Sequence, residues 1–166
     1  MISAEYRALN ELLHQSDPAY GSGSGAKYGE FVLEAMRRTG STTVLDYGCG
    51  KGSLKRALGA FVANYDPAVP EWSEMPSPAD LVVCTDVLEH VEPEQLVAVL
   101  SHIRGLALRA VFFVIACREA RKTLADGRNA HLIVEPPEWW AELLSEQFKP
   151  MVRHVSDDND LLMVCR

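Results

Sequence analysis

Strand-like apolar runs that alternate with helical segments constrain the fold of this 166-residue chain more than any other feature. The spacing of apolar side chains predicts helices over 5–15, 28–38, 53–59 and 93–105, and one after Pro136 and Pro137. Strand-like runs lie between them, at 42–47, 61–66, 81–86 and 110–116. This alternation indicates an α/β fold of the Rossmann-like kind, with a mostly parallel sheet and helices on both faces. Two final runs, 151–155 and 161–165, flank a polar turn and predict an antiparallel C-terminal hairpin.

The charge and the cysteines exclude several classes of protein. The formal net charge is -7, whereas proteins that bind nucleic acid broadly usually carry the opposite sign. No apolar run approaches the roughly 20 residues of a membrane-spanning helix, and the first residues lack the layout of a signal peptide. None of the four cysteines has C-x-x-C spacing, so we expect reduced thiols and a cytoplasmic protein.

The most informative segment, Asp46-Tyr47-Gly48-Cys49-Gly50-Lys51-Gly52, follows the first predicted strand. Its alternate glycines allow a sharp turn and a close approach to a ligand. A phosphate-binding P-loop would need Ser or Thr after the lysine and a glycine five positions before it, and both are missing. A dinucleotide fingerprint would need a third glycine at position 53, where the chain has Ser53.

Two acids at strand ends favour a third kind of ligand. Asp46 suits a ligand with a positively charged end, and Asp66, at the end of the next strand, is placed to accept hydrogen bonds from ribose hydroxyls. A ribonucleoside with a cationic amino-acid arm satisfies both acids. S-adenosylmethionine is such a compound, and we take it as the predicted cofactor.

Three motifs resemble those of the class I S-adenosylmethionine-dependent methyltransferases: 44–52, Tyr65-Asp66-Pro67 and 80–91. The likeness covers 41–117 well and the rest in outline. It implies a seven-stranded sheet. We expect a single domain, 1–166, with N-terminal helices at 1–40 and a cofactor-binding core at 41–166. The Gly-Ser stretch at 20–25 would form a mobile lid with these helices or, more simply, a flexible linker between them. The cofactor site implied by the resemblance consists of Asp46, Tyr47, Gly48, Gly50, Asp66, Pro67 and Asp86.

The chain departs from this family between Asp66 and Asp80, where there is little room for the usual helix and third strand. The residue that contacts the adenine ring therefore has no clear counterpart. Glu74 is the nearest acidic candidate, with Met75 as an apolar contact.

A second cluster is predicted after the later strands. If residues 86–90 form a turn, Asp86, Glu89 and His90 converge, and His131 follows the adjacent strand. Such oxygen and nitrogen ligands suit magnesium, manganese, iron or zinc, and a divalent ion could lower the pKa of a bound hydroxyl. The set resembles that of the small-RNA 3′-terminal 2′-O-methyltransferases, although Asp86 is shorter than their usual Glu and their accessory domains are absent.

Other interpretations of these residues stay open. Leu-Glu-His-Val also occurs in small-molecule methyltransferases without a metal, where His90 or His131 would accept the proton beside Glu89. A non-catalytic module that binds the cofactor and works through a partner is a further alternative. Base methylation is disfavoured, because the Asn/Asp-Pro-Pro motif is missing and Cys84 and Cys117 lie in apolar runs. We therefore predict O-methylation of a small molecule or of a nucleotide or RNA terminus.

The segment after the last apolar parallel run is basic. It carries Arg118, Arg121, Lys122 and Arg128. A solvated loop is the favoured interpretation, and phosphate recognition at the mouth of the site is the alternative.

Overall fold

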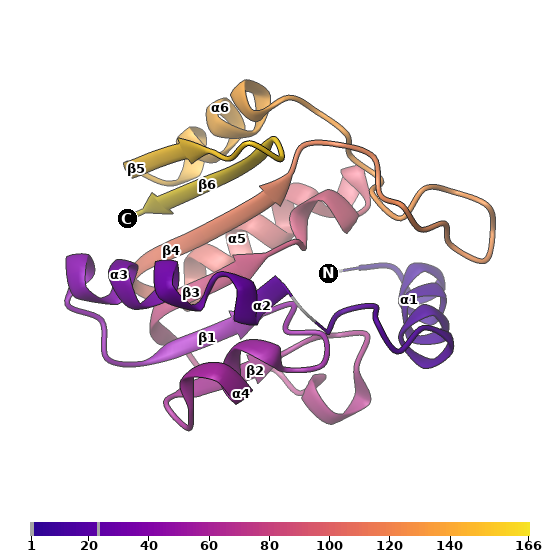
Figure 1. The fold of residues 1–166 in the computed structure, drawn as a ribbon, viewed down its shortest axis with the longest axis horizontal. Coiled ribbons are helices and arrows are strands. Elements are labelled where there is room, and N and C mark those ends of the chain that lie inside the picture. The colour runs from indigo at the N-terminus through magenta and orange to yellow at the C-terminus, as the bar shows by residue number, and fades with distance from the viewer. Residues whose placement is uncertain (1, 23) are drawn as a thin grey trace.

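The computed structural model describes residues 2–22 and 24–166, and Figure 1 shows that a single twisted sheet forms the centre of this part of the chain. Its six strands are β1 (Val44–Tyr47), β2 (Val62–Tyr65), β3 (Ala79–Thr85), β4 (Ala107–Ala116), β5 (Pro150–Val155) and β6 (Asp160–Cys165). They lie in the order β2-β1-β3-β4-β6-β5. The first four run parallel, and β6 is antiparallel to both β4 and β5. The predicted α/β class and C-terminal hairpin are thus confirmed.

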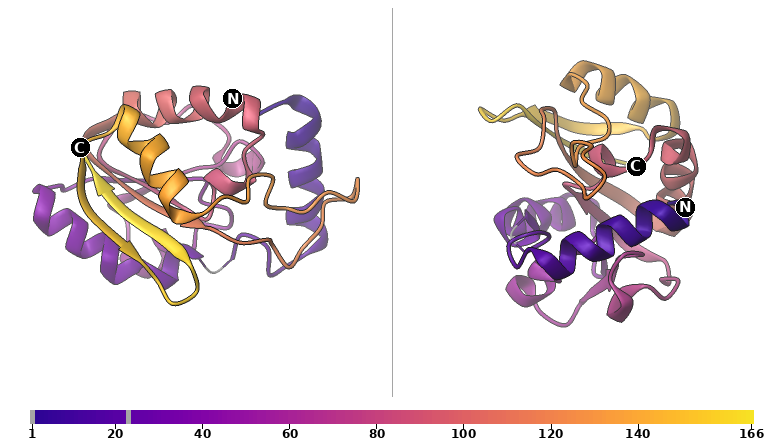
Figure 2. Two further views of the ribbon diagram at one scale, coloured as in Figure 1. Left: turned by 90° about the horizontal axis from the view of Figure 1, so that it is seen from above. Right: turned by 90° about the vertical axis from the view of Figure 1, so that its right-hand side faces the viewer.

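Helices cover both faces of the sheet, as Figures 1 and 2 show. The α-helices of the described residues are α1 (Ala4–Ser16), α2 (Ser24–Lys27), α3 (Gly29–Thr39), α4 (Ser53–Leu58), α5 (Leu96–Leu106) and α6 (Pro137–Gln147). Side chains of α3 and α4, such as Val32 and Leu54, pack against Val83 on one face. Side chains of α5 and α6 pack on the other face, against Val82 and the other strand residues that point to that face. Consecutive strand residues thus point into two separate cores, which explains why these strands are apolar without interruption.

Helix α1 does not belong to either layer. It lies across the end of the sheet at which β1, β3 and β4 finish, and the right-hand view of Figure 2 shows it crossing that end. In parallel sheets, ligands bind beyond the carboxyl ends of the strands. The N-terminal segment therefore covers the region where a ligand site is expected.

The structure corrects several details of the prediction. Gly105 does not end its helix, because α5 continues to Leu106. The Gly-Ser stretch at 20–25 was expected to be a flexible linker, yet α2 begins at Ser24; Gly23 lies outside the described residues. The described part of the sheet has six strands rather than seven. The connection from 67 to 78 holds only a 3-10 turn, Pro70–Trp72, as the short spacing between Asp66 and Asp80 suggested.

The described residues include no helix that is both long and apolar enough to cross a membrane.

The core beneath α6 provides a test of packing. Trp140 is fully buried, but its indole N–H has no hydrogen-bond partner. We expect Trp140→Ala to lower the free energy of unfolding by about 3–5 kcal/mol. Trp140→Phe should cost clearly less, because it fills most of the space and removes a buried donor that nothing satisfies. Urea denaturation of the three proteins checks this order, and equal losses for both variants would contradict it.

Candidate active site

A cavity of about 540 Å³ opens at the carboxyl ends of the parallel strands. Its walls come from the loops after β1, β2, β3 and β4 and, on the opposite side, from the N-terminal segment. Most of the residues predicted to bind the cofactor line it: Tyr47, Gly48, Gly50, Asp66, Pro67 and Asp86. The parallel register of the strands brings these residues together from widely separated positions in the chain.

The glycines after β1 are required by close packing. Gly48 has φ 76°, and a Cβ there would lie 2.4 Å from Cγ2 of Val87. Gly50 has φ 51°, and a Cβ there would lie 2.6 Å from the carbonyl oxygen of Gly21. The N–H of Lys51 donates to that same carbonyl at 2.8 Å. The loop after β1 is therefore in direct contact with the N-terminal segment that covers the cavity.

The two predicted acids differ in their positions. Asp66 lines the cavity, and its carboxylate accepts the N–H groups of Gly50 and Ala68, both at 2.9 Å. These bonds fix the carboxylate at the edge of the glycine loop and leave it further acceptor capacity. Asp46 is only 2% exposed and is not among the described residues that line the cavity. Burial, with the nearby charge of Asp66, raises the pKa of Asp46 to about 7.

The candidates for contact with adenine do not reach the cavity. Met75 is 70% exposed, Glu74 is exposed as well, and neither belongs to the cavity lining. The strand that the family usually has between β2 and β3 is absent from the described part of this chain, and the connection over residues 67–78 therefore lies mostly outside the site. The cavity surface near Asp66 is formed instead by Pro67 and Ala68.

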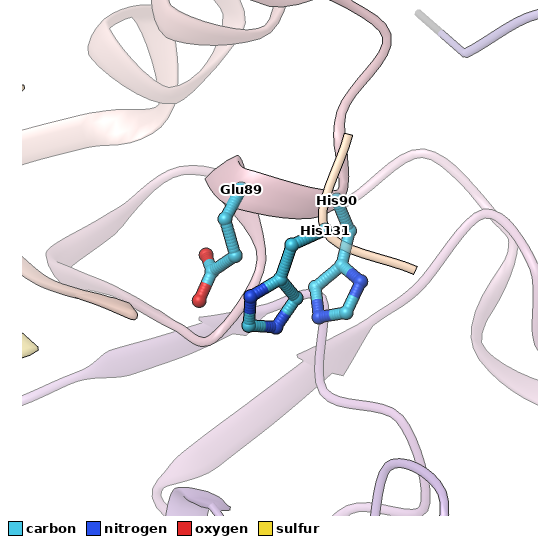
Figure 3. A group of neighbouring side chains, drawn as sticks. All are labelled: Glu89, His90 and His131. Carbon is cyan, nitrogen blue, oxygen red and sulfur yellow. The ribbon is translucent and has the colours of Figure 1, made fainter. Parts of the chain in front are cut away.

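Glu89, His90 and His131 converge, as Figure 3 shows. One ligand atom from each residue lies within 4.8 Å of those of the other two. Glu89 and His90 belong to the 3-10 turn after β3, Leu88–His90, and His131 comes from the segment after β4. The two imidazole rings lie 4.6 Å apart and perpendicular. Asp86, which was predicted as a fourth ligand, is not part of this described group, although it lines the same cavity.

Backbone carbonyl groups fix the tautomers of both histidines. Nδ1 of His90 lies 2.7 Å from the carbonyl oxygen of Ala130, and Nδ1 of His131 lies 2.5 Å from that of Arg118. A carbonyl oxygen only accepts, so each Nδ1 carries the hydrogen. Each Nε2 then keeps a lone pair. Histidines that bind metals in proteins are usually held by this same kind of bond.

The carboxyl group of Glu89 is the third group that could bind a cation. Its side chain is fully buried, and Oε1 accepts the N–H of Ala116 at 2.8 Å. Oε2 is buried without a hydrogen-bond partner. Burial, together with the charge of Asp86, raises the pKa of Glu89, and burial lowers the pKa of His90 to about 3. A neutral His90 imidazole beside a carboxyl oxygen that has no hydrogen-bond partner in the described chain suits a cation site before a cation binds.

The N-terminal segment adds polar residues that sequence reasoning missed. Tyr6, Asn10 and His14 lie on the cavity side of α1, and Tyr20 follows from the next turn. The ring of Tyr20 lies 6.0 Å from that of His90, and the Tyr20 hydroxyl bonds Oδ1 of Asn10 at 3.1 Å. The hydroxyl of Tyr6 and Nδ1 of His14 are buried without partners.

A signal for this polar face was present in the sequence. Tyr6, Asn10 and His14 recur every four residues, which places them on one side of a helix. The prediction instead placed Tyr6, Leu9, Leu12 and Leu13 on one face of the helix. It thus included Tyr6, which is buried, but missed Asn10 and His14, and Leu12 is 50% exposed. The apolar pattern was misleading here because α1 packs over a polar cavity rather than onto the core.

Both ends of α1 are attached to the core. At its start, the N–H and hydroxyl of Ser3 each donate to the Glu92 carboxylate at 2.7 Å. Beyond its end, Asp17 forms an ion pair with Lys122. The basic segment is thus more than a solvated loop, since Arg118, Arg121 and Lys122 line the cavity; Arg128 pairs with Asp126.

Asp46 makes the stability of the protein depend on pH. Its raised pKa means that the folded state holds, between about pH 4 and pH 7, a proton that the unfolded chain has released. The free energy of unfolding therefore falls as pH rises through this window. We expect Asp46→Asn to remove part of this fall, so that the variant gains up to about 4 kcal/mol relative to wild type between pH 4 and pH 8. Urea unfolding at both pH values measures it, and a difference that does not change with pH would contradict it.

Comparisons with known proteins agree with this site. A family model described as a methyltransferase domain matches residues 10–149. No sequence among the curated proteins matches the chain. One similar structure is the 1,6-didemethyltoxoflavin-N1-methyltransferase of Burkholderia thailandensis with 1,6-didemethyltoxoflavin and S-adenosylhomocysteine bound. The two chains are 19% identical, with a TM-score of 0.70 over 100% of this chain and 91% of that one.

Two further structures have the same fold. The magnesium protoporphyrin IX methyltransferase of Synechocystis PCC 6803, with S-adenosylhomocysteine bound, is 20% identical, with a TM-score of 0.56 over 84% of this chain and 81% of that one. The mitomycin 7-O-methyltransferase is 15% identical, with a TM-score of 0.60 over 85% of this chain and 53% of that one. The family match covers most of the 166 residues, and the chain therefore belongs to the class I S-adenosylmethionine-dependent methyltransferases.

Proposed function

We propose that this methyltransferase transfers a methyl group to an oxygen atom of a small molecule or nucleotide-like compound, and that a divalent cation bound by Glu89, His90 and His131 assists the transfer. The observation that carries the proposal is the convergence of these three side chains at the cavity that the glycine loop also lines: His90 and His131 line it, and Glu89 lies buried next to them. Three atoms are thus available to coordinate a cation and have no other partner among the described residues: Nε2 of His90, Nε2 of His131 and Oε2 of Glu89.

The donor set fits a cation and narrows its identity. Two imidazoles and one carboxylate suit manganese, iron or zinc, whereas magnesium prefers oxygen ligands. When bound, the cation would lower the pKa of a coordinated hydroxyl and hold that oxygen in place. It would also favour the ionised form of Glu89, which burial disfavours in its absence.

The other residues of the chain bind and orient the two reactants. Asp66 is placed to accept the ribose hydroxyls, and Gly48 and Gly50 let the backbone approach the cofactor closely. Tyr20 and His90 both line the cavity, in edge-to-face contact with each other, and would border the acceptor. Because α1 covers this space, its groups would keep water away from the reacting atoms.

The size of the cavity favours a small acceptor. The space of about 540 Å³ has to hold both the cofactor and the acceptor, and its covered shape admits only the end of a longer chain. The similar structures support this choice, since their names specify didemethyltoxoflavin, magnesium protoporphyrin IX and mitomycin as substrates. The net charge of -7 is also unfavourable for contacts along a nucleic acid.

A metal-independent reaction with His90 as the base is the second candidate. His90 lines the cavity in edge-to-face contact with Tyr20, and this favours the second candidate, since an acceptor bound in the cavity could lie beside the imidazole. A base with a pKa near 3, however, accepts protons poorly near neutral pH. Removal of the metal distinguishes the two candidates.

Metal removal is the direct test of the proposal. We expect protein treated with a chelator to lose at least about 100-fold in activity towards a panel of small vicinal diols and catechols, read as release of S-adenosylhomocysteine. Manganese, iron or zinc added singly should restore it. Full activity in metal-free protein would support His90 as the base and overturn the metal assignment.

Binding of manganese can be measured without a substrate. We expect Glu89→Gln to weaken Mn²⁺ binding about 100-fold in calorimetry, because the amide keeps the shape of the side chain but cannot provide an anionic ligand. The control is Glu74→Gln, the same chemical change at an exposed position outside the cavity. Equal Mn²⁺ affinity in both variants would contradict the assigned site.

The cofactor site has its own test. We expect Asp66→Asn to weaken S-adenosylhomocysteine binding about 10–100-fold, because the site loses a charged acceptor and the new NH₂ group faces a backbone N–H. Asp157→Asn, an exposed position in the final turn, is the matched control. Calorimetry measures both, and unchanged affinity for Asp66→Asn would remove this residue from the cofactor site.

A further inference from the structure

The chain leaves the sheet after β4 and, through a long excursion over residues 117–131, returns to the turn after β3, where the N–H of Ile133 donates to the carbonyl of Glu89. Figure 1 shows this excursion as the orange loop that extends beyond the sheet on the right. Backbone hydrogen bonds join its two arms: the N–H of Ala130 donates to the carbonyl of Lys122 at 3.0 Å, and the N–H of Leu124 donates to the carbonyl of Arg128 at 2.8 Å. The excursion is therefore a paired structure with a defined register rather than an open loop.

The base of the excursion provides three parts of the candidate metal site. It supplies the His131 imidazole itself. It also supplies the carbonyl groups of Arg118 and Ala130, which accept the Nδ1–H of His131 and His90 respectively. A shift of one arm of the excursion against the other would separate His131 from its carbonyl partner, because these two groups lie on opposite arms.

One side chain joins the two arms at this point. Oδ1 of Asn129 accepts the N–H of Ala120 at 3.0 Å and the N–H of His131 at 2.9 Å. Nδ2 of Asn129 donates to the carbonyl of Ala120 at 3.0 Å. The opposite assignment of the amide would place donors against donors, so this orientation is the one that satisfies the backbone.

We infer that Asn129 is a positioning residue for the candidate metal site. Its amide holds the arms of the excursion in the register that keeps the hydrogens of His90 and His131 on Nδ1, and so leaves both Nε2 atoms available to a cation. Asn129 does not itself belong to the group of ligands. This inference deepens the proposed function and rests on it.

A second attachment acts on the arm of Arg118. The guanidinium group of Arg118 pairs with Asp160, which is 1% exposed and also accepts the hydroxyl of Tyr28 at 2.9 Å. This arm is thus held by the core even without Asn129. Loss of the Asn129 amide should therefore displace mainly the returning arm, with Ala130 and His131, and should leave the fold intact.

The test compares Asn129→Ala with Asp126→Ala. Asp126 accepts the N–H of Arg128 at 3.0 Å and pairs with its guanidinium group at the tip of the same excursion, away from the histidines. Both variants lose a side chain that bonds the backbone of the excursion, but only Asn129 bonds the N–H of His131 and joins it to Ala120 on the other arm. Three quantities are measured on each protein: the melting temperature, the histidine tautomers from ¹⁵N–¹H spectra of the metal-free protein, and the affinity for Mn²⁺.

We expect Asn129→Ala to shift His131 from the single Nδ1–H form to a mixture of tautomers and to weaken Mn²⁺ binding about 10–100-fold. Asp126→Ala should change neither, at a similar melting temperature. The inference is overturned if Asn129→Ala keeps wild-type tautomers, or if Asp126→Ala shifts them equally. If wild type binds no Mn²⁺ while the tautomers still respond to Asn129→Ala, the metal assignment fails and the positioning role stands.

Discussion

The arrangement of the site depends on one buried residue, Glu89. Its carboxyl group accepts the N–H of Ala116 at the end of β4, and its backbone carbonyl accepts the N–H of Ile133 at 3.0 Å, just after the excursion returns. The same residue therefore holds the point where the chain leaves the sheet and the point where it comes back. His131 is brought beside His90 by this double attachment, and the parallel sheet places both next to the glycine loop.

Burial of Glu89 has an energetic cost that the rest of the site has to offset. A carboxylate without solvent is strongly destabilised, and one backbone N–H satisfies only part of it. In the protein without a cation, the raised pKa of Glu89 lets the group stay protonated and neutral. Burial raises the pKa of Asp46 in the same way, to about 7. The proposed cation, once bound, would favour the ionised form of Glu89, and its binding would then be coupled to the stability of the fold.

Much of this structure could be predicted from the sequence, for physical reasons that also explain the failures. Apolar runs that alternate with helices determine a doubly covered sheet, and the segments after parallel strands meet at one edge, so the sequence could predict that Asp66, Glu89 and His131 lie at the same end of the sheet. Asp46 was predicted to contact the cofactor but is buried behind the cavity surface, because a strand position alone does not determine the depth of a side chain. The spacing of Tyr6, Asn10 and His14 places them on one side of α1, but periodicity does not show that this side packs over a polar cavity, nor that Asn129 bonds the backbone of Ala120 and His131.

The absence of a strand between β2 and β3 and the position of α1 over the strand ends both shape the cavity. The connection after β2 contributes only Pro67 and Ala68 to the described cavity lining, and Glu74 and Met75 are exposed to solvent. The N-terminal segment crosses the strand ends instead, and the contact between Gly50 and the Gly21 carbonyl shows how closely it approaches the core. Tyr6, Asn10 and His14 of α1 line the cavity. A ligand bound there would therefore meet polar side chains of α1, whereas Glu74 and Met75 would lie out of its reach.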